Sequence, residues 1–335
     1  MTIIYLYRSL AAFGGVERIF IDKANYLAEH YGYHVYIITW EQGGHSIVYP
    51  LSPKVTHVDW GILFYRQYQY GLFKRMFMQW KMEKEFFKKL SNFVHTTQAD
   101  IVIGASCEFT TMAGMDLLQR KTHTILETHS MRTSIEKNNP PAGNLLMRRA
   151  FKRRDKQLHQ YIKHMSAFVT LTHNDAKDWS DITPQARIIP NMLHRYPAEI
   201  SPDKKTQKRI ITAGRLVEQK GYDLLLDAWS KVHQKHPEWI LDIYGEGEDK
   251  TMLLEKRKNL ALENSVLFHP PTLDIYQKYM DSDFYVMSSR YEGFGLVLAE
   301  AMSCGIPCVS FDCPHGPSDI IKDHEDGLLV EKENI

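Results

Sequence analysis

The sequence lacks any run of roughly 18 or more apolar residues, although 44% of its 335 residues are hydrophobic. A helix needs about 20 such residues to cross the hydrocarbon core of a bilayer, so we expect no membrane-spanning segment. The first residues, MTIIYLYRS, contain no basic leader and soon reach a polar residue, unlike a secretory signal peptide. We therefore expect either a cytoplasmic protein or a peripheral protein on the inner face of a membrane.

The net charge is also small, and cysteine is scarce. The formal net charge is +1, so no global field draws the chain to nucleic acid, and a charged partner must meet a local patch. The spacing of the four cysteines does not match a zinc ribbon, and we expect buried free thiols. Asp281 and Asp283 have the spacing of a metal-binding pair, but they precede a predicted strand, at the edge where ligands do not bind. We therefore expect no metal site. The cysteines are Cys107, Cys304, Cys308 and Cys313.

Short apolar segments alternate along the chain with longer helical patterns. The segments TIIYLY, HVYIITW, DIVIGAS and AFVTLT lie in the first half, and KRIITAGR, WILDIYGEG and FYVMSS in the second. Near-continuous apolar strands separated by helices are typical of parallel sheets that are covered on both faces. The sequence predicts an α/β fold with two doubly wound, Rossmann-like domains, residues 1–195 and 205–335. A proline-containing linker at residues 189–209 would join them.

Two cations follow the first predicted strand of the second half. Arg215 and Lys220 lie in AGRLVEQKG, and Gly221 precedes an amphipathic helical pattern. In a parallel α/β sheet this loop lies at the carboxyl edge of the strands, where ligands bind. A guanidinium and an ammonium would suit a pyrophosphate there, but both residues are equally compatible with an ordinary surface loop.

Two glutamates bracket a glycine-rich turn further along the chain. Glu292 precedes Gly293-Phe294-Gly295, and Glu300 lies inside the helical pattern that follows. The start of that helix is an anion site, because its free N–H groups and its dipole favour negative charge. A buried carboxylate needs hydrogen-bond donors, and the vicinal hydroxyls of a ribose would supply them to Glu300. The alternatives are a dipole contact for Glu292 and a surface helix position for Glu300.

The first half offers weaker signals. Gly14 and Gly15 open a helix after the first strand, so that a phosphate or sugar could approach closely. The pair lacks the full GxGxxG pattern, which argues against a dinucleotide-dependent oxidoreductase. His129 follows the predicted strand HTILET, again at a carboxyl edge. It could equally be a loop histidine whose ring nitrogens form hydrogen bonds within the protein and contact no ligand.

Taken together, these motifs resemble the retaining family-4 glycosyltransferases of the GT-B fold. The resemblance is carried by GRLVEQKG, YGEGED and SRYEGFGLVLAEAMSCGIPCVSFDCPHGPSDII, with the E-x7-E spacing of Glu292 and Glu300, and extends from FGGVER through ETHS and IPN to DGLLV. It implies a GT-B fold whose N-terminal domain binds the acceptor and whose C-terminal domain binds a nucleotide-sugar. It also implies that the C-terminal domain would continue for several tens of residues beyond Ile335.

The resemblance implies a role for each matching residue. Arg215 and Lys220 would hold the donor diphosphate and stabilise it as it leaves, and no metal would be required. Glu300 would accept the ribose hydroxyls, and His129 would contact the transferred sugar. Glu292 would contact the sugar or act as a nucleophile. The remaining donor-binding residues would be Gly15 in the first domain and Gly245, Glu246, Pro271, Thr272, Gly293, Phe294, Gly295 and Leu296 in the second.

The implied reaction is the transfer of a hexose or N-acetylhexosamine from a UDP-sugar to a lipid-linked glycan. The segment FDCPHGPSDII is similar to enzymes that build bacterial capsule, O-antigen and exopolysaccharide repeat units. The donor would be the only nucleotide compound involved, without a separate cofactor. The alternatives are a non-catalytic nucleotide-sugar-binding scaffold and a GT-B epimerase of UDP-sugars.

Residues 65–93 combine basic and aromatic side chains. Phe73, Phe77, Trp80 and Phe87 fall near one face of a predicted helix, among seven Lys or Arg residues and two Glu residues. Such a helix could lie on an anionic membrane surface. It could equally pack its aromatic stripe on the core and expose a basic face.

Overall fold

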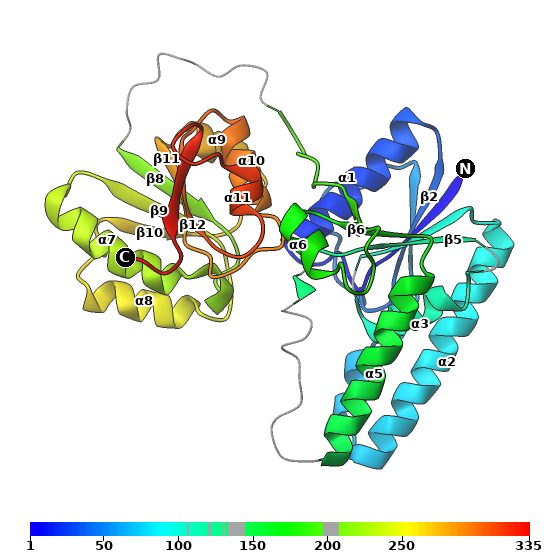
Figure 1. Cartoon of the computed structure of the whole chain (residues 1–335). Coiled ribbons are helices and arrows are strands. Elements are labelled where there is room, and N and C mark those ends of the chain that lie inside the picture. The colour runs from blue at the N-terminus through cyan, green and yellow to red at the C-terminus, as the bar shows by residue number, and fades with distance from the viewer. Residues whose placement is uncertain (106, 120–121, 130, 133–144, 197–207) are drawn as a thin grey trace. The chain divides into compact units, whose positions relative to one another are not determined.

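The computed structural model describes residues 1–105, 107–119, 122–129, 131–132, 145–196 and 208–335. The chain forms two compact units, Met1–Ile189 and Pro190–Ile335 (Figure 1). Each unit is an α/β structure built on its own parallel sheet. The predicted fold class, with two doubly wound units, is confirmed.

Unit 1 contains a seven-stranded sheet in the order β3-β2-β1-β4-β5-β6-β7, and every pair of neighbours is parallel. The chain builds outward from β1 in one direction and then in the other, so a topological switch point lies between β1 and β4. The strands are β1 (Thr2–Leu6), β2 (His34–Thr39), β3 (Val55–Asp59), β4 (Ile101–Gly104), β5 (His123–Glu127), β6 (Ala167–Thr170) and β7 (Arg187–Ile188).

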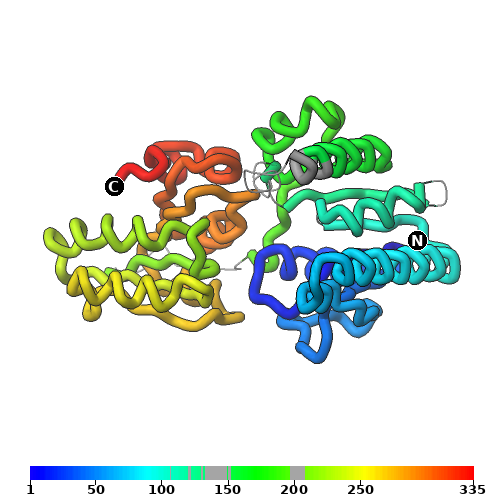
Figure 2. Tube along the Cα trace, turned by 90° about the horizontal axis from the view of Figure 1, so that it is seen from below, coloured from blue at the N-terminus to red at the C-terminus, as the bar shows by residue number. Residues whose placement is uncertain are grey.

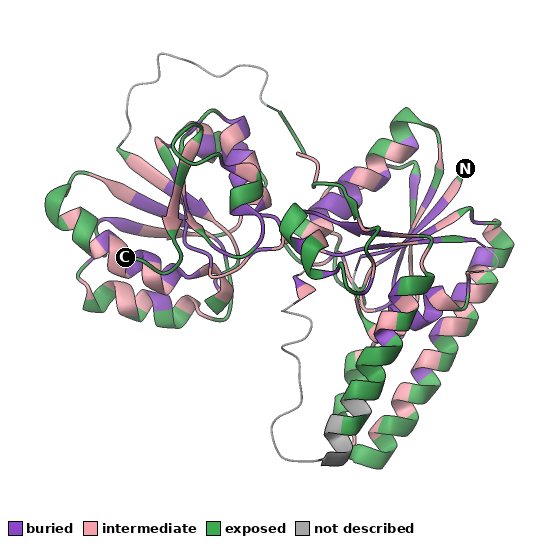
Figure 3. Ribbon diagram, in the orientation of Figure 1, coloured by how far each residue is buried: buried purple, intermediate pink, exposed green. Residues whose placement is uncertain are grey.

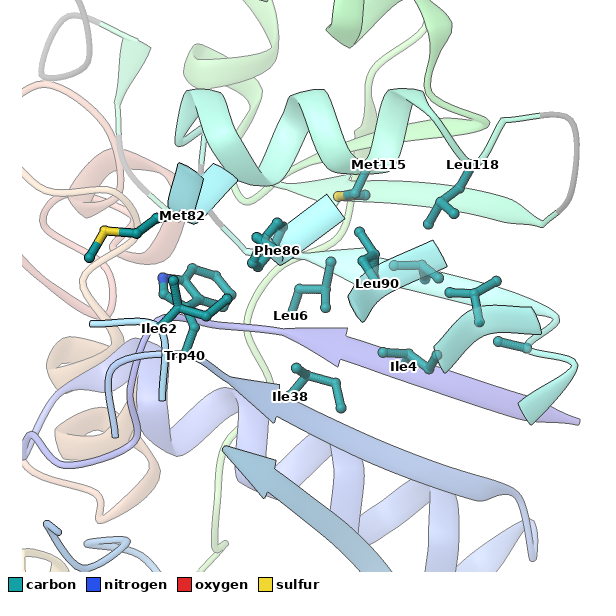
Figure 4. Close-up of a cluster of buried hydrophobic side chains, with 13 residues drawn as sticks. Ile4, Leu6, Ile38, Trp40, Ile62, Met82, Phe86, Leu90, Met115 and Leu118 are labelled. Carbon is teal, nitrogen blue, oxygen red and sulfur yellow. The ribbon is translucent and has the colours of Figure 1, made fainter. Parts of the chain in front are cut away.

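Helices cover both faces of this sheet, because successive side chains of a strand point to opposite sides. Ile3 and Tyr5 of β1 pack in one cluster with helix α1, whereas Ile4 and Leu6 pack in another with helix α2 (Figure 4). The described helices of unit 1 are α1 (Gly15–His30), η1 (Phe64–Gln69), α2 (Leu72–Thr97), α3 (Phe109–Asp116), α5 (Leu145–His164) and α6 (His173–Asp178).

Unit 2 repeats this plan with six parallel strands in the order β10-β9-β8-β11-β12-β13. Its switch point lies between β8 and β11. The strands are β8 (Arg209–Ala213), β9 (Ile240–Tyr244), β10 (Val266–His269), β11 (Phe284–Met287), β12 (Cys308–Asp312) and β13 (Gly327–Glu331). The helices are η2 (Glu218–Lys220), α7 (Tyr222–Lys235), α8 (Lys250–Asn259), α9 (Ile275–Met280), α10 (Leu296–Ser303) and α11 (Pro317–Ile320).

The Cα trace in Figure 2 shows the helices of each unit arranged around the strands. No helix among the described residues is both long and apolar enough to cross a bilayer. All four cysteines are free, and Cys304, Cys308 and Cys313 are buried. Burial raises the pKa of the Cys308 and Cys313 thiols to about 12, so neither forms a reactive thiolate near neutral pH. These three therefore match the buried thiols expected from the sequence.

Candidate functional site

The loops after β8 and β11 meet at the switch point of unit 2. Ligands of open α/β sheets bind at this place, outside the carboxyl ends of the strands. A small pocket lies there, between the ends of the two strands and the start of α10. It is lined by Thr212, Ala213, Lys220, Tyr222, Tyr285, Met287, Ser288, Ser289 and Val297.

Lys220 and Glu292 form an ion pair in this region. The Lys220 Nζ lies 2.6 Å from Glu292 Oε1, and the Ser289 hydroxyl donates to the same oxygen at 2.6 Å. The side chains of Lys220 and Glu292 are only 15% and 7% exposed. Because charges removed from water need partners, the pair holds a cation and an anion at fixed positions beside the pocket. The structure thus joins two residues that the sequence predicts for one site, 72 positions apart.

Further contacts fasten the two loops to each other. Arg290 donates to both carboxylate oxygens of Asp223, at 2.8 and 2.7 Å, and also to the carbonyl of Glu218 at 2.8 Å. The amide of Gln219 donates to the carbonyl of Tyr291 at 3.0 Å. The hydrogen bonds from Arg290 lower the pKa of the Asp223 carboxyl, which therefore stays ionised. The sequence analysis missed this clamp, because nothing in either motif indicates that Arg290 and Asp223 are neighbours.

Gly221 permits the close approach of the loops. Its φ is +62°, in the left-handed region that favours glycine. A Cβ atom at this position would lie 2.1 Å from the carbonyl oxygen of Ser288, far inside van der Waals contact. The backbone of the Lys220 loop can therefore pass the β11 loop only with glycine at residue 221.

Glycine also shapes the start of α10. Gly295 is the N-cap of the helix, with φ +87°, and Leu296 is its first residue. Phe294 is 9% exposed, so its side chain packs inside unit 2. A Cβ atom on Gly316 would lie 2.1 Å from the Phe294 carbonyl oxygen, so the backbone at Gly316 packs directly against this turn. The predicted donor contacts of residues 293–296 are thus backbone groups of a fixed turn.

Glu300 lies on α10 and is 5% exposed. The Tyr279 hydroxyl donates to its Oε2 at 3.5 Å, and burial, followed by the charge of Glu300, raises the pKa of that tyrosine well above its ordinary value. The alternative that Glu300 is a surface helix residue is therefore wrong.

The remaining predicted donor residues of unit 2 follow neighbouring strands. Arg215 lies after β8 and is exposed, and no described residue forms an ion pair with its side chain. Gly245 and Glu246 follow β9, and the Leu216 N–H donates to the Glu246 carbonyl at 2.9 Å. A Cβ atom on Gly245 would lie 1.9 Å from the Gly214 carbonyl oxygen. The loops after β8 and β9 are therefore in direct contact.

Pro271 and Thr272 belong to the loop after β10. This loop adjoins that of β9, because the Gly245 N–H donates to the carbonyl of His269, the last residue of β10, at 3.0 Å. The structure therefore brings the predicted donor-binding residues of unit 2 to the carboxyl edge of one sheet. The aligned strand ends explain this arrangement.

In unit 1, the glycine turn before α1 carries a nearby carboxylate. Gly14 is the N-cap of α1, and Gly15 is its first residue. A Cβ atom on Gly14 would lie 2.1 Å from Glu17 Oε2, and the Tyr7 hydroxyl donates to Glu17 Oε1 at 3.2 Å. An anionic ligand at Gly15 would therefore meet the Glu17 side chain, which would have to turn away.

His129 takes part in a buried charged group at the end of β5. Its Nε2 lies 3.4 Å from Glu127 Oε2, which also accepts a 2.7 Å hydrogen bond from Lys23 on α1. Burial alone would raise the pKa of Glu127, but the hydrogen bond from His129 and the charge of Lys23 outweigh it and lower the pKa. His129 Nδ1 is buried, and it has no hydrogen-bond partner among the described residues. Lys23 and Glu127 were not predicted from the sequence.

Two doubly wound units with parallel sheets and a site at their strand ends define the GT-B architecture, the class to which this fold belongs. A structure of S. aureus TarM has a TM-score of 0.76 with this chain at 16% sequence identity. It covers 99% of this chain, which in turn covers 90% of TarM. At this identity the likeness shows the fold.

Sequence comparison is more specific for unit 2. Residues 198–335 match the family model Glycosyl transferases group 1. A Haemophilus influenzae protein, "Uncharacterized glycosyltransferase", is 29% identical over 341 residues, with 99% of this chain and 86% of the relative covered. The amylovoran biosynthesis glycosyltransferase AmsD of Erwinia amylovora is 42% identical over 144 residues, or 43% of this chain and 39% of AmsD.

Proposed function

We propose that this chain is a retaining, metal-independent family-4 glycosyltransferase. It would transfer a hexose or N-acetylhexosamine from a UDP-sugar to a lipid-linked glycan, in the synthesis of capsule, O-antigen or exopolysaccharide. The observation that carries the proposal is the buried Lys220–Glu292 pair beside the start of α10. This arrangement sets a fixed cation and a helix N-terminus at the edge where ligands of this fold bind.

The chemistry needs stabilisation of a diphosphate that gains negative charge as the sugar departs. Preorganised positive groups that face this charge are the largest expected catalytic contribution. Lys220 is held by Glu292, whereas the exposed Arg215 side chain is available to a ligand. These two cations and the N–H groups at the start of α10 would supply that stabilisation, which is why we propose a metal-independent reaction.

Glu292 is proposed as a contact residue rather than as the nucleophile. Its Oε1 accepts hydrogen bonds from both Lys220 and Ser289. These bonds stabilise the carboxylate and orient Lys220, and a carboxylate stabilised in this way is a weaker nucleophile. This geometry supports a front-face reaction, in which the departing phosphate oxygen takes the proton of the acceptor hydroxyl while the new glycosidic bond forms on the same face.

The donor and acceptor classes rest on similarity. The S. aureus TarM structure is a complex with UDP, alpha-GlcNAc-glycerol and fondaparinux, and AmsD is named for amylovoran biosynthesis. These names support a UDP-sugar donor and a polysaccharide pathway for this chain. An acceptor linked to a lipid would be reached at a membrane surface, and we propose its cytoplasmic face.

The proposal can be tested by measuring UDP release from UDP-glucose, UDP-galactose and their N-acetylated forms, with and without polyprenyl-diphosphate-linked saccharide. We expect acceptor-dependent release from at least one donor, reduced about 100-fold or more in Lys220→Ala. Lys235→Ala, which removes an exposed lysine at the end of α7, is the control and should retain activity. UDP binding without turnover of any donor would contradict the transferase and favour a binding scaffold. Release without acceptor in both variants would point to hydrolysis or epimerisation.

A further inference from the structure

The first turns of α2 and the preceding η1 carry large apolar side chains in solvent. Seven of them lie within 16 residues and are between 49% and 87% exposed. Monomeric soluble proteins rarely expose so many large apolar side chains together. We call these residues, with the basic residues among them, the α2 tip. The seven are Tyr65, Tyr68, Leu72, Phe73, Met76, Phe77 and Trp80.

The second half of α2 is different. Met82, Phe86, Leu90 and Val94 follow each other at intervals of four residues and are buried in the core of unit 1 (Figure 4). Figure 3 shows the exposed positions concentrated in the early turns of α2 and the buried positions in its later turns. The alternative of a helix packed on the core therefore holds for the second half of α2. The core accounts for the second half and leaves the α2 tip uncovered by any described residue.

The α2 tip is also basic. Between residues 65 and 84 there are five Lys or Arg residues and one acidic residue, Glu83, which accepts hydrogen bonds from Gln79 and Thr110. Several cations lie against aromatic rings: Lys74 is 4.3 Å from the Tyr70 ring centroid and Arg75 is 4.1 Å from that of Tyr68. The five basic residues are Arg66, Lys74, Arg75, Lys81 and Lys84.

We propose that the α2 tip docks on an anionic lipid surface. Aromatic side chains partition into the headgroup region of a bilayer, and interleaved Lys and Arg residues are attracted to anionic lipids. A second copy of this chain fits less well, because it would bring the same cations together. Protein interfaces are enriched in aromatic residues and arginine but depleted in lysine, and three of the five basic residues of the tip are lysines. Interleaved cations and aromatic rings in one continuous segment therefore favour the lipid surface.

The position of the α2 tip in unit 1 adds a functional consequence. The Tyr65 N–H donates to Glu41 Oε1 at 3.1 Å, and Glu41 also pairs with Arg8. Arg8 and Glu41 follow β1 and β2, so the tip begins at the carboxyl edge of the sheet. If the proposed transferase function is correct, a lipid-linked acceptor would be presented at this edge. Lipid docking itself rests on the exposure and charge of the tip and does not depend on that function.

The test is cosedimentation of the full chain with vesicles of phosphatidylglycerol or of phosphatidylcholine. We expect binding to phosphatidylglycerol that weakens as salt rises, because screening reduces attraction between exposed charges. Phosphatidylcholine should bind much less. Phe73→Ser with Phe77→Ser should lower the affinity by at least about tenfold. Lys74→Gln with Arg75→Gln should weaken binding at low salt and reduce its salt dependence, because two of the five basic residues are lost.

The matched control is Tyr26→Ser with Tyr31→Ser. These tyrosines are 44% and 58% exposed and lie at α1, away from the tip, and their loss should leave binding unchanged. Circular dichroism would verify that each variant is folded. The proposal is overturned if the chain binds neither vesicle at low salt, or if the tip variants bind as the wild type does. It is also overturned if the tip variants instead abolish a dimer in solution without any lipid binding.

Discussion

Glu127 lies between a lysine and a histidine, and this position determines what His129 can offer a ligand. The carboxylate stays ionised because its pKa is lowered, so the Nε2 atom that faces it must carry a proton and donate. In the tautomer with its proton on Nε2, Nδ1 presents a lone pair. This atom is buried and has no partner among the described residues, so it remains able to accept a hydrogen bond.

The first prediction concerns this tautomer. In ¹⁵N spectra of the histidine-labelled chain, we expect His129 to hold its proton on Nε2, with signals assigned by their loss in His129→Gln. Glu127→Ala removes the acceptor and should produce a mixture of tautomers. His324, with a side chain 81% exposed, is the internal control and should not respond. A proton found on Nδ1 in the wild type would contradict the proposed orientation of the imidazole.

At the scale of elements, several contacts join the loops after β8 and β11 into one packed segment. The Lys220–Glu292 pair, the Arg290–Asp223 clamp and the contact of Gly221 with Ser288 all join the same two segments. Each contact links residues 67 or more positions apart, and each lies within unit 2. A substitution that separates Gly221 from Ser288 should therefore lower the free energy of unfolding of unit 2 and also disturb the site.

The second prediction compares two glycines with similar φ. Gly221→Ala adds a Cβ atom 2.1 Å from a carbonyl oxygen, whereas at Gly32, with φ +65°, a Cβ atom would meet nothing within 4 Å. The positive φ alone should cost about 1 kcal/mol in Gly32→Ala. Gly221→Ala should cost at least about 3 kcal/mol, because the loops must also separate. Denaturant unfolding measures both losses, and equal losses would show that the β8 and β11 loops separate easily.

Much of the arrangement of elements follows from local sequence. Runs such as IIYL and VYII are apolar on both faces, which predicts buried parallel strands, and the helical periods between them predict the covering layers. The α2 helix shows the limit of this reasoning. Its aromatic residues repeat at helical spacing along the first three turns and beyond, so periodicity alone could not indicate where the core ends.

At the scale of the whole molecule, one buried carboxyl group should make the stability of unit 1 depend on pH. Asp175 of unit 1 is 3% exposed. Burial, and then the nearby Asp178 carboxylate, raises its pKa to about 7. An unfolded aspartate ionises near pH 4. Between about pH 4 and 7 the folded state therefore holds a proton that the unfolded state has released, so stability falls as pH rises.

The third prediction follows from this sign. Asp175→Asn should raise the unfolding temperature of unit 1 at pH 8, with a gain of up to about 4 kcal/mol in the free energy of unfolding. The gain should shrink towards zero near pH 4, where the wild-type carboxyl is protonated in both states. Calorimetry at several pH values measures this, with Glu255→Gln, an exposed change in unit 2, as the control. A gain independent of pH would contradict the raised pKa.

The candidate site was predictable only in part. The predicted residues Lys220, Glu292 and Glu300 lie in recognisable segments, and a parallel fold necessarily brings their strand ends to one edge. Arg290, Asp223, Lys23 and Glu127 were not predicted, because their contacts join residues 67 and 104 positions apart. Such pairings depend on the packed fold, and neither periodicity nor composition indicates them.

The clamp between the β8 and β11 loops has a consequence for how this architecture can diversify. All of its contacts lie inside unit 2, so these loops hold their shape without help from the rest of the chain. A ligand that binds there meets a surface already assembled and loses little freedom of those loops on binding. Recombination that joins unit 2 to a different N-terminal unit would therefore carry these loops over in their present shape.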